Sequence, residues 1–335
     1  MKKWFLLICL LSIKSSFSQG QDFFNLLDDA TLYADKYITP MADAAVYQAS
    51  SAWMTSAKKR DLWSVTVSVH GNAFFVPQSD KSFQISNSDF KFLNIEGAST
   101  LQAQTALGGT QVNYLTGNLN LQLAPGLFTT VPVRIETPKG IEQNTIIYPY
   151  IMASVGLWQG TEVAVKYSTK TQLKKGDYQV YGFGIKHNLS QYFKSLEDSK
   201  INIATMITLS KEEINFRFLD VQVPVIGSLG IEEIKSKVTT KQLQLNVSKD
   251  FENWEILAGL IVNNSDFKYE FTGNDNTNVT GIKEILNERV KDIAKNKTNF
   301  LGELSARYNF KKFYLQPTVA FGKFINTNFS VQYEF

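Results

Sequence analysis

The search for catalytic chemistry in this 335-residue sequence starts from its two histidines, His70 and His187. Thr66 and Ser68 share the parity of His70 in a stretch where polar and apolar residues alternate, so a strand would place all three on one face. A hydroxyl beside a histidine is the beginning of a nucleophile–base pair. Neighbours at i and i+2 on one strand lie about 7 Å apart, and a hydrolase also needs an orienting group and an oxyanion hole. The sequence marks neither of these, so we expect no enzymatic activity.

Ligands for a metal ion or a cofactor are scarce in the sequence. The two histidines are far apart, and the single cysteine, Cys9, lies in the apolar N-terminal stretch. Zinc sites in proteins need several nitrogen or sulfur ligands at close spacing. The Gly182-x-Gly184 pair lacks the further glycine and the strand-to-helix setting of a phosphate-binding loop. We therefore expect no metal site and no cofactor.

The first 18 residues have the pattern of a secretory signal peptide. Lys2 and Lys3 precede an apolar run at 4–11, which is too short to cross a bilayer as a helix, and Ser16-Phe17-Ser18 fits the small-x-small cleavage pattern. Cleavage before Gln19 would remove Cys9 and three of the 34 basic residues, which leaves 31 basic and 31 acidic residues. A formally neutral mature chain argues against a nucleic-acid partner.

Residues 19–58 are expected to form an N-terminal helical segment. Apolar residues in 22–37 recur with helical spacing, Pro40 is expected to end that helix, and 41–57 continue with many small residues. Two alternatives stay open for this segment. It is either a plug in the periplasmic mouth of a barrel, or a periplasmic cap or arm that docks a partner.

From Asp61 onward the hydrophobic period changes to two, which predicts strands. Trp63, Val65, Val67 and Val69 alternate with polar residues over a length that suits a tilted membrane-crossing strand. Further alternating segments include 118–123, 151–167, 181–186, 201–209, 242–248, 300–310 and 313–321. We predict an all-β fold in which residues 59–335 form a transmembrane antiparallel β-barrel of about 12–14 strands. Two inserts, 211–238 and 281–296, are expected to form long external loops. A soluble β-sandwich is the alternative fold.

The C-terminus ends in strict alternation. Large apolar residues lie at Phe329, Val331, Tyr333 and Phe335, and polar residues lie between them. The terminal aromatic residue resembles the signal by which outer-membrane barrels are recognised for assembly. We therefore expect the barrel-assembly machinery and outer-membrane lipid as partners, and the cell outer membrane as the location.

Strand parity also predicts which side chains face the lumen, because alternate residues of a barrel strand point to opposite sides. A charge that faced lipid would be costly, which favours the lumen for the charged members. The candidate lumen residues are Ser64, Thr66, Ser68, His70, Glu162, Lys166, Glu303 and Arg307.

Several stretches resemble an uncharacterised family of Bacteroidetes-type secreted proteins described as outer-membrane barrels of unknown function. They are YITP at 37–40, GNAFFVP at 71–77, GLWQGTE at 156–162 and YGFGIKH at 181–187. The family is similar in layout to the long-chain fatty-acid transporter barrels, although the Asn-Pro-Ala hatch motif of those transporters is absent from the sequence. This resemblance implies a barrel that binds or transports small hydrophobic molecules through a plugged lumen. The alternative is a structural barrel that does not transport and instead anchors external loops or docks periplasmic partners.

Overall fold

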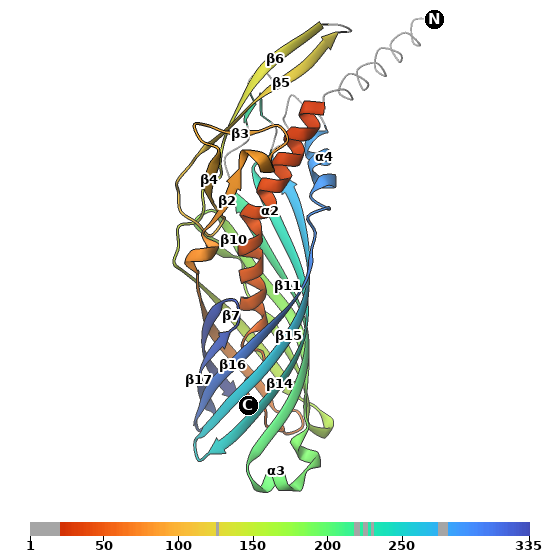
Figure 1. Cartoon of the computed structure of the whole chain (residues 1–335). Coiled ribbons are helices and arrows are strands. Elements are labelled where there is room, and N and C mark those ends of the chain that lie inside the picture. The colour runs from red at the N-terminus through yellow and green to blue at the C-terminus, as the bar shows by residue number, and fades with distance from the viewer. Residues whose placement is uncertain (1–20, 125–126, 218–221, 224–226, 229–230, 274–280) are drawn as a thin grey trace, which may run out of the picture.

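The computed structural model describes residues 21–124, 127–217, 222–223, 227–228, 231–273 and 281–335. The expected signal peptide at 1–18 lies outside these residues. Figure 1 shows a long β-barrel with a helix running down its axis. The barrel strands are β1 (Val65–Phe75), β7 (Thr145–Gly156), β8 (Thr161–Tyr167), β10 (Gly176–Asn188), β11 (Ile201–Arg217), β14 (Glu233–Phe251), β15 (Trp254–Thr272), β16 (Asn296–Phe310), β17 (Phe313–Phe321) and β18 (Ile325–Glu334).

These ten strands pair antiparallel in a closed ring. Each strand pairs with the next one in the order given, and β1 joins β18 to close the ring, with His70 opposite Ser330 on one side and Tyr150 on the other. The expected barrel fold is therefore confirmed, but with ten strands among the described residues and not 12–14. The alternation at 118–123 belongs to β5 (Tyr114–Ala124), which pairs with β6 (Leu127–Glu136) and β3 (Asn94–Ile95) in a separate sheet. Alternation marks a strand but not the sheet that the strand joins.

The two ends of the barrel differ. At one end, called the turn end, two-residue turns join β14 to β15 and β16 to β17, and Phe335 ends the chain. The loop between β10 and β11, with the 3-10 turn η4 (Ser190–Tyr192) and helix α3 (Lys194–Asp198), is at the same end. At the opposite end, called the loop end, residues 76–144 connect β1 to β7 and contain β2 (Ser82–Ser86) and β4 (Thr100–Gln104).

The insert expected at 211–238 differs from the prediction. Much of it extends the barrel wall, because β11 continues to Arg217 and β14 begins at Glu233. The short strands β12 (Gln222–Val223) and β13 (Gly227–Ser228) form a hairpin between them. The insert at 281–296, expected to form a long external loop, contains helix α4 (Ile282–Arg289).

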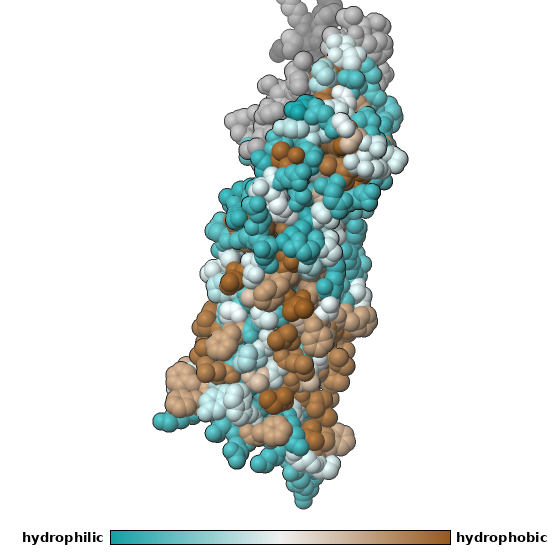
Figure 2. Space-filling view, turned by 60° about the vertical axis from the view of Figure 1, so that its left-hand side comes forward, coloured by the Kyte–Doolittle hydropathy of each residue, from teal (hydrophilic) through white to brown (hydrophobic). Residues whose placement is uncertain are grey.

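The polarity of the wall inverts along its long strands. On β15, outward-facing Ile256 and Leu260 are 45% and 70% exposed, whereas Lys268 and Glu270 face outward nearer the loop end. The inner face changes in the opposite sense, from Asn263 and Ser265 to Phe267, Tyr269 and Phe271, all of them buried. Figure 2 shows the result on one face, with apolar side chains gathered over the half nearer the turn end and polar side chains above them. The outer face of a single strand is therefore apolar near the turn end and polar near the loop end.

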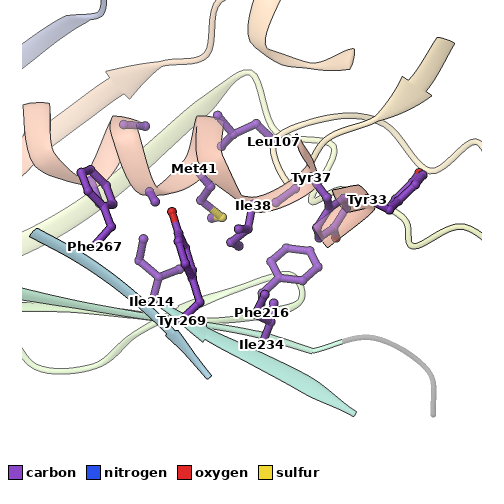
Figure 3. Close-up of a cluster of buried hydrophobic side chains, with 14 of the residues drawn as sticks. Tyr33, Tyr37, Ile38, Met41, Leu107, Ile214, Phe216, Ile234, Phe267 and Tyr269 are labelled. Carbon is purple, nitrogen blue, oxygen red and sulfur yellow. The ribbon is translucent and has the colours of Figure 1, made fainter. Parts of the chain in front are cut away.

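Helix α2 (Gln21–Ser50) fills the barrel where its inner face is apolar. In Figure 3, Tyr37, Ile38 and Met41 lie against Phe216 of β11 and Tyr269 of β15. The structure corrects the expected break, because Pro40 lies inside one continuous helix. Proline removes one helical hydrogen bond, but apolar residues on both sides of it are buried, and packing of this kind overrides local propensity. Burial also raises the pKa of the Tyr37 phenol, which donates to the carbonyl of Lys139 at 2.9 Å.

The zone of outward-facing apolar side chains nearer the turn end is called the apolar belt, and the part of the protein that extends beyond it is called the tower. It comprises the first half of α2, residues 76–144, α4 and the loop ends of β11, β14 and β15. Asp29, 1% exposed, accepts hydrogen bonds from the backbone amides of Lys91, Phe92 and Leu93, each at 2.8 Å. Lys297 at the start of β16 pairs with Asp43 at 2.6 Å. These contacts tie the helix to the surrounding chain.

The described part of the segment predicted at 19–58 lies inside the barrel, and the mouth of the barrel that it plugs stays a prediction. The helix begins at the loop end, opposite Phe335, and most of its second half is buried within the barrel. A cap or docking arm beyond the turn end would need the second half of α2 to be exposed and not buried in the barrel. Among the described residues, no helix combines the length and apolar character needed to cross a membrane.

Candidate functional site

The lumen segment, residues 49–60, comprises the last two residues of α2 and the ten residues that follow them. It lies inside the polar half of the barrel. Ser51, Trp53 and Ser56 are each 1% exposed, and Ala52 has a positive φ of 54° that turns the chain out of the helix. The helix has ended, so the backbone groups of this segment need other partners, because a buried unpaired backbone group is costly. Side chains of the barrel wall supply them.

Lys166 of β8 binds the end of the helix. Its ammonium donates to the carbonyls of Ala49 at 3.1 Å and Ser51 at 2.8 Å, and it lies 4.4 Å and 4.7 Å from the ring centres of Trp53 and Tyr150. The side chain is 1% exposed. The last carbonyls of a helix carry partial negative charge, so a cation here is favourable. Lys166 therefore holds the junction between α2 and the lumen segment.

Two buried carboxylates bind the amide groups of the segment. Glu303 of β16 accepts a hydrogen bond from the amide of Ala52 at 2.7 Å. Glu255 of β15 accepts from the amide of Ala57 at 3.1 Å and from the Ser56 hydroxyl at 2.8 Å. The segment is thus fixed from the wall strands that face it.

A cluster of ion pairs lies nearer the turn end. Lys186 of β10 donates to the carbonyls of Ser56 at 3.0 Å and Lys58 at 3.2 Å, and it also pairs with Glu162. Arg60 of the lumen segment pairs with Glu334 of β18. Arg307 lies 3.8 Å from both Glu255 and Glu334. We call these ion-paired groups, together with Lys166 and Glu303, the charge lattice: Arg60, Glu162, Lys166, Lys186, Glu255, Glu303, Arg307 and Glu334.

The structure brings Ser68 and His70 into contact. The Ser68 hydroxyl lies 2.8 Å from His70 Nε2, and His70 Nδ1 lies 3.0 Å from Asn328 Oδ1, which has the connectivity of a nucleophile, a base and an orienting group. The His70 ring stacks on Tyr150 at 4.4 Å. Ser68 and His70 are only 2% and 1% exposed, and Ser68 also contacts the carbonyl of Met152 at 3.2 Å. The group joins β1, β7 and β18 and is closed to a substrate while the lumen is filled.

The structure places seven of the eight candidate lumen residues on the inner face, where each is at most 5% exposed. The exception is Ser64, which precedes β1, is partly exposed, and donates to the carbonyl of Asp61 at 2.9 Å. Glu162, Lys166, Glu303 and Arg307 belong to the charge lattice. The other three, Thr66, Ser68 and His70, line β1.

The candidate list lacked Arg60, Lys186, Glu255, Asn328 and Glu334. Three of them carried a usable signal, because Lys186, Glu255 and Glu334 are charged residues that alternate with apolar neighbours. Asn328 sits on a strand more than 250 positions from His70, and only the closure of β1 against β18 brings it near. Arg60 lies in a segment without regular structure, where parity has no meaning.

The proposed assembly signal lies on the outer face of β18 and at the chain end. Phe329, Val331 and Phe335 are 50%, 41% and 68% exposed, and the Tyr333 ring packs edge-on against Phe313 and Phe335. Its role in assembly stays a prediction.

A polar pocket opens beside the lumen segment at the turn end. It is lined by Ser56, Lys58, Lys59, Arg60, Asp61, Glu252, Asn253, Trp254, Glu255, Arg307, Asn309, Tyr314 and Glu334. Charges of both signs alternate around it, unlike the apolar lining of sites for hydrophobic molecules. Within the described part of the chain, no group of three or more acidic, histidine or cysteine side chains is arranged to hold a metal ion.

Comparison with solved structures returns outer-membrane barrels. The translocator domain of the autotransporter NalP from Neisseria meningitidis is 8% identical, with 91% of this chain and 99% of that chain covered and a TM-score of 0.35. The outer-membrane protease OmpT from Escherichia coli is 12% identical, with coverages of 84% and 100% and a TM-score of 0.29. An outer-membrane channel from Pseudomonas putida F1 is 10% identical, with coverages of 85% and 100% and a TM-score of 0.28.

No curated protein matches the sequence. The family model that does match extends over residues 1–335 and carries no assigned activity. The chain therefore belongs to the family of unknown function DUF6588.

Proposed function

We propose that this protein is a sealed outer-membrane barrel that anchors the tower on the outer side of the membrane. The apolar belt supports the membrane location. On β15 the outward apolar residues run from Trp254 to Val262, roughly 27 Å along the strand at about 3.3 Å per residue. With the usual barrel tilt this length approaches the apolar band of about 25 Å that outer-membrane barrels present.

The orientation follows from the two ends. Outer-membrane barrels have short turns on the periplasmic side and longer loops outside. The two-residue turns and Phe335 share one end here, and the tower lies at the other. The tower is polar outside and has its own apolar core around α2, as an extramembrane domain requires.

The seal is carried by one observation, the hydrogen bonding of the lumen segment to wall strands on different sides of the barrel. Lys166 and Lys186 hold its carbonyls, while Glu303 and Glu255 hold its amides. Hydrogen bonds to charged groups contribute about 1.5–3 kcal/mol each, so withdrawal of the segment would cost on the order of 10 kcal/mol. It would also leave buried charges without partners.

Transport of small hydrophobic molecules, the function implied by the layout, would require this segment to leave a lumen whose walls carry the charge lattice beside an apolar cluster that includes Met152 and Met206. The anchoring alternative needs no such movement, and for this reason we favour it. Both functions make the protein a membrane component without catalytic chemistry. Outer-membrane lipid and the barrel-assembly machinery are its proposed partners.

Conductance in planar bilayers tests the seal. The intact protein is expected to show no stable channel, and deletion of residues 21–60 is expected to open one. Because this deletion also removes the core of the tower, the paired substitution Lys166→Met with Glu303→Gln provides a milder test, with outward-facing Lys241→Met as the matched control. Steady conductance by the intact protein would contradict the proposal. An acyl species that co-purifies with it in two detergents would instead favour transport.

A further inference from the structure

The chain crosses the barrel from the loop end to the turn end before its first wall strand. α2 begins with Gln21 at the loop end, descends inside the barrel, and passes through the lumen segment to the start of β1 at the turn end. β1 then returns to the loop end in the wall. The first 44 described residues therefore traverse the whole barrel before the first wall strand begins.

The traverse is anchored at successive levels. Near its start Asp22 accepts a hydrogen bond from the Asn120 side chain at 2.9 Å, and nearly two turns of helix later Asp28 pairs with Arg289 of α4. Further down, Asp35 pairs with Lys295 at 2.6 Å. The charge lattice then holds the lumen segment. These contacts hold the chain along its whole path, from the tower through the lumen to the start of β1.

The contacts in the polar half suit a polypeptide of small residues. Wall side chains bind mostly backbone carbonyls and amides, which every residue except proline carries in full. Side chains of the segment that face the wall are largely short, such as Ser50, which accepts a hydrogen bond from Asn263 at 2.8 Å, and Ser51, which contacts Asn326 at 2.6 Å. The lumen is thus built around an extended peptide, and this explains the run of small residues that follows Tyr47.

We infer that the barrel carries its own N-terminal segment outward, so that Gln21 and any chain ahead of it are displayed on the outer side of the membrane. The inference rests on the proposed outer-membrane location, since it takes the turn end as periplasmic. It adds the destination of the N-terminus to that proposal. The occupant of the lumen is a polypeptide of this same chain, and the displayed end is the start of α2.

Cysteine labelling on intact cells tests this inference. In a Cys9→Ser background, single cysteines replace Gln21 at the start of α2, Ser88 in the tower, or Ser199 beside α3 at the turn end; all three positions are exposed. A maleimide that does not cross membranes is applied before and after the outer membrane is permeabilised. Gln21→Cys and Ser88→Cys are expected to react on intact cells, and Ser199→Cys only after permeabilisation.

Each other pattern overturns a specific step. If Ser88→Cys reacts on intact cells but Gln21→Cys does not, the tower is outside, the N-terminus is not displayed, and only the inference fails. If Ser199→Cys alone reacts on intact cells, the orientation is reversed and the proposed function fails with it. A short epitope inserted ahead of Gln21 gives a second readout through antibody binding and protease removal on intact cells. Absence of both signals from a folded, heat-modifiable barrel would also overturn the inference.

Discussion

Replacing Lys166 by methionine should weaken the barrel more than any substitution of an outward-facing lysine. Methionine has a similar length and leaves the packing against Trp53 and Tyr150 nearly filled. It removes the two hydrogen bonds to the carbonyls of Ala49 and Ser51 at 3.1 and 2.8 Å. It also removes the cation at the end of α2.

The magnitude follows from these losses. Each hydrogen bond to a charged group contributes about 1.5–3 kcal/mol, and breaking a buried charged interaction by removing one partner costs about 3–5 kcal/mol. We therefore expect the free energy of unfolding to fall by about 3–5 kcal/mol. If the loss acts on release of the lumen segment, the open fraction rises by about 10²- to 10³-fold, because 1.4 kcal/mol is a factor of ten.

The assay is urea unfolding of the protein reconstituted in lipid vesicles, followed by tryptophan fluorescence, together with bilayer conductance of the same preparation. Lys241→Met is the matched control, since Lys241 is exposed on the outer face of β14. Its effect should stay within about 0.5 kcal/mol. A Lys166→Met protein as stable and as closed as the control would refute the role assigned to the charge lattice.

Three further predictions concern other parts of the molecule. Glu255→Gln keeps the volume but removes the charge that receives Ser56 and Ala57, so stability should fall by about 1–3 kcal/mol in the same unfolding assay, and an unchanged midpoint would count against the contact. Asp29→Ala leaves the three amides of 91–93 without their acceptor, so limited proteolysis should cut 76–144 faster than in an Asp266→Ala control, and equal rates would show that Asp29 does not hold the tower. Leu260→Arg in the apolar belt should cost about 2–4 kcal/mol of folding free energy in vesicles, whereas Lys268→Leu on the same face of β15 should change little; equal costs would place the membrane boundary elsewhere.

Much of the wall could be predicted from period-two alternation. The method worked where one face is apolar and the other polar, as in β1, where Val67 and Val69 face out while Ser68 and His70 face in. It gave too many strands because alternation in β5 looks the same whether the strand joins the barrel or the tower. Period-two alternation also failed to predict the long extensions of β11 and β14, because the polarity of the two strand faces inverts where the wall leaves the apolar belt.

The path of the N-terminal segment could not be predicted. Helical spacing identified α2, but the direction in which a helix crosses a barrel depends on contacts with distant strands. Asp43, for example, pairs with Lys297, and Arg60 with Glu334. The members of the charge lattice come from six different parts of the fold, and no local pattern links them. Pro40 was misleading for the same reason, because tertiary packing outweighed the local signal.

The most direct test of the sealed barrel is a crosslink between the lumen segment and the wall. Ser51 lies 2.6 Å from the Asn326 side chain, so cysteines at both positions in a Cys9→Ser background should join through a short thiol crosslinker. The account predicts an intramolecular crosslink in folded protein, with neither thiol reacting with a maleimide that is confined to the aqueous phase. Free reaction of the Ser51→Cys thiol with that maleimide, without a crosslink to Asn326→Cys, would show that the segment lies outside the lumen and would contradict the account.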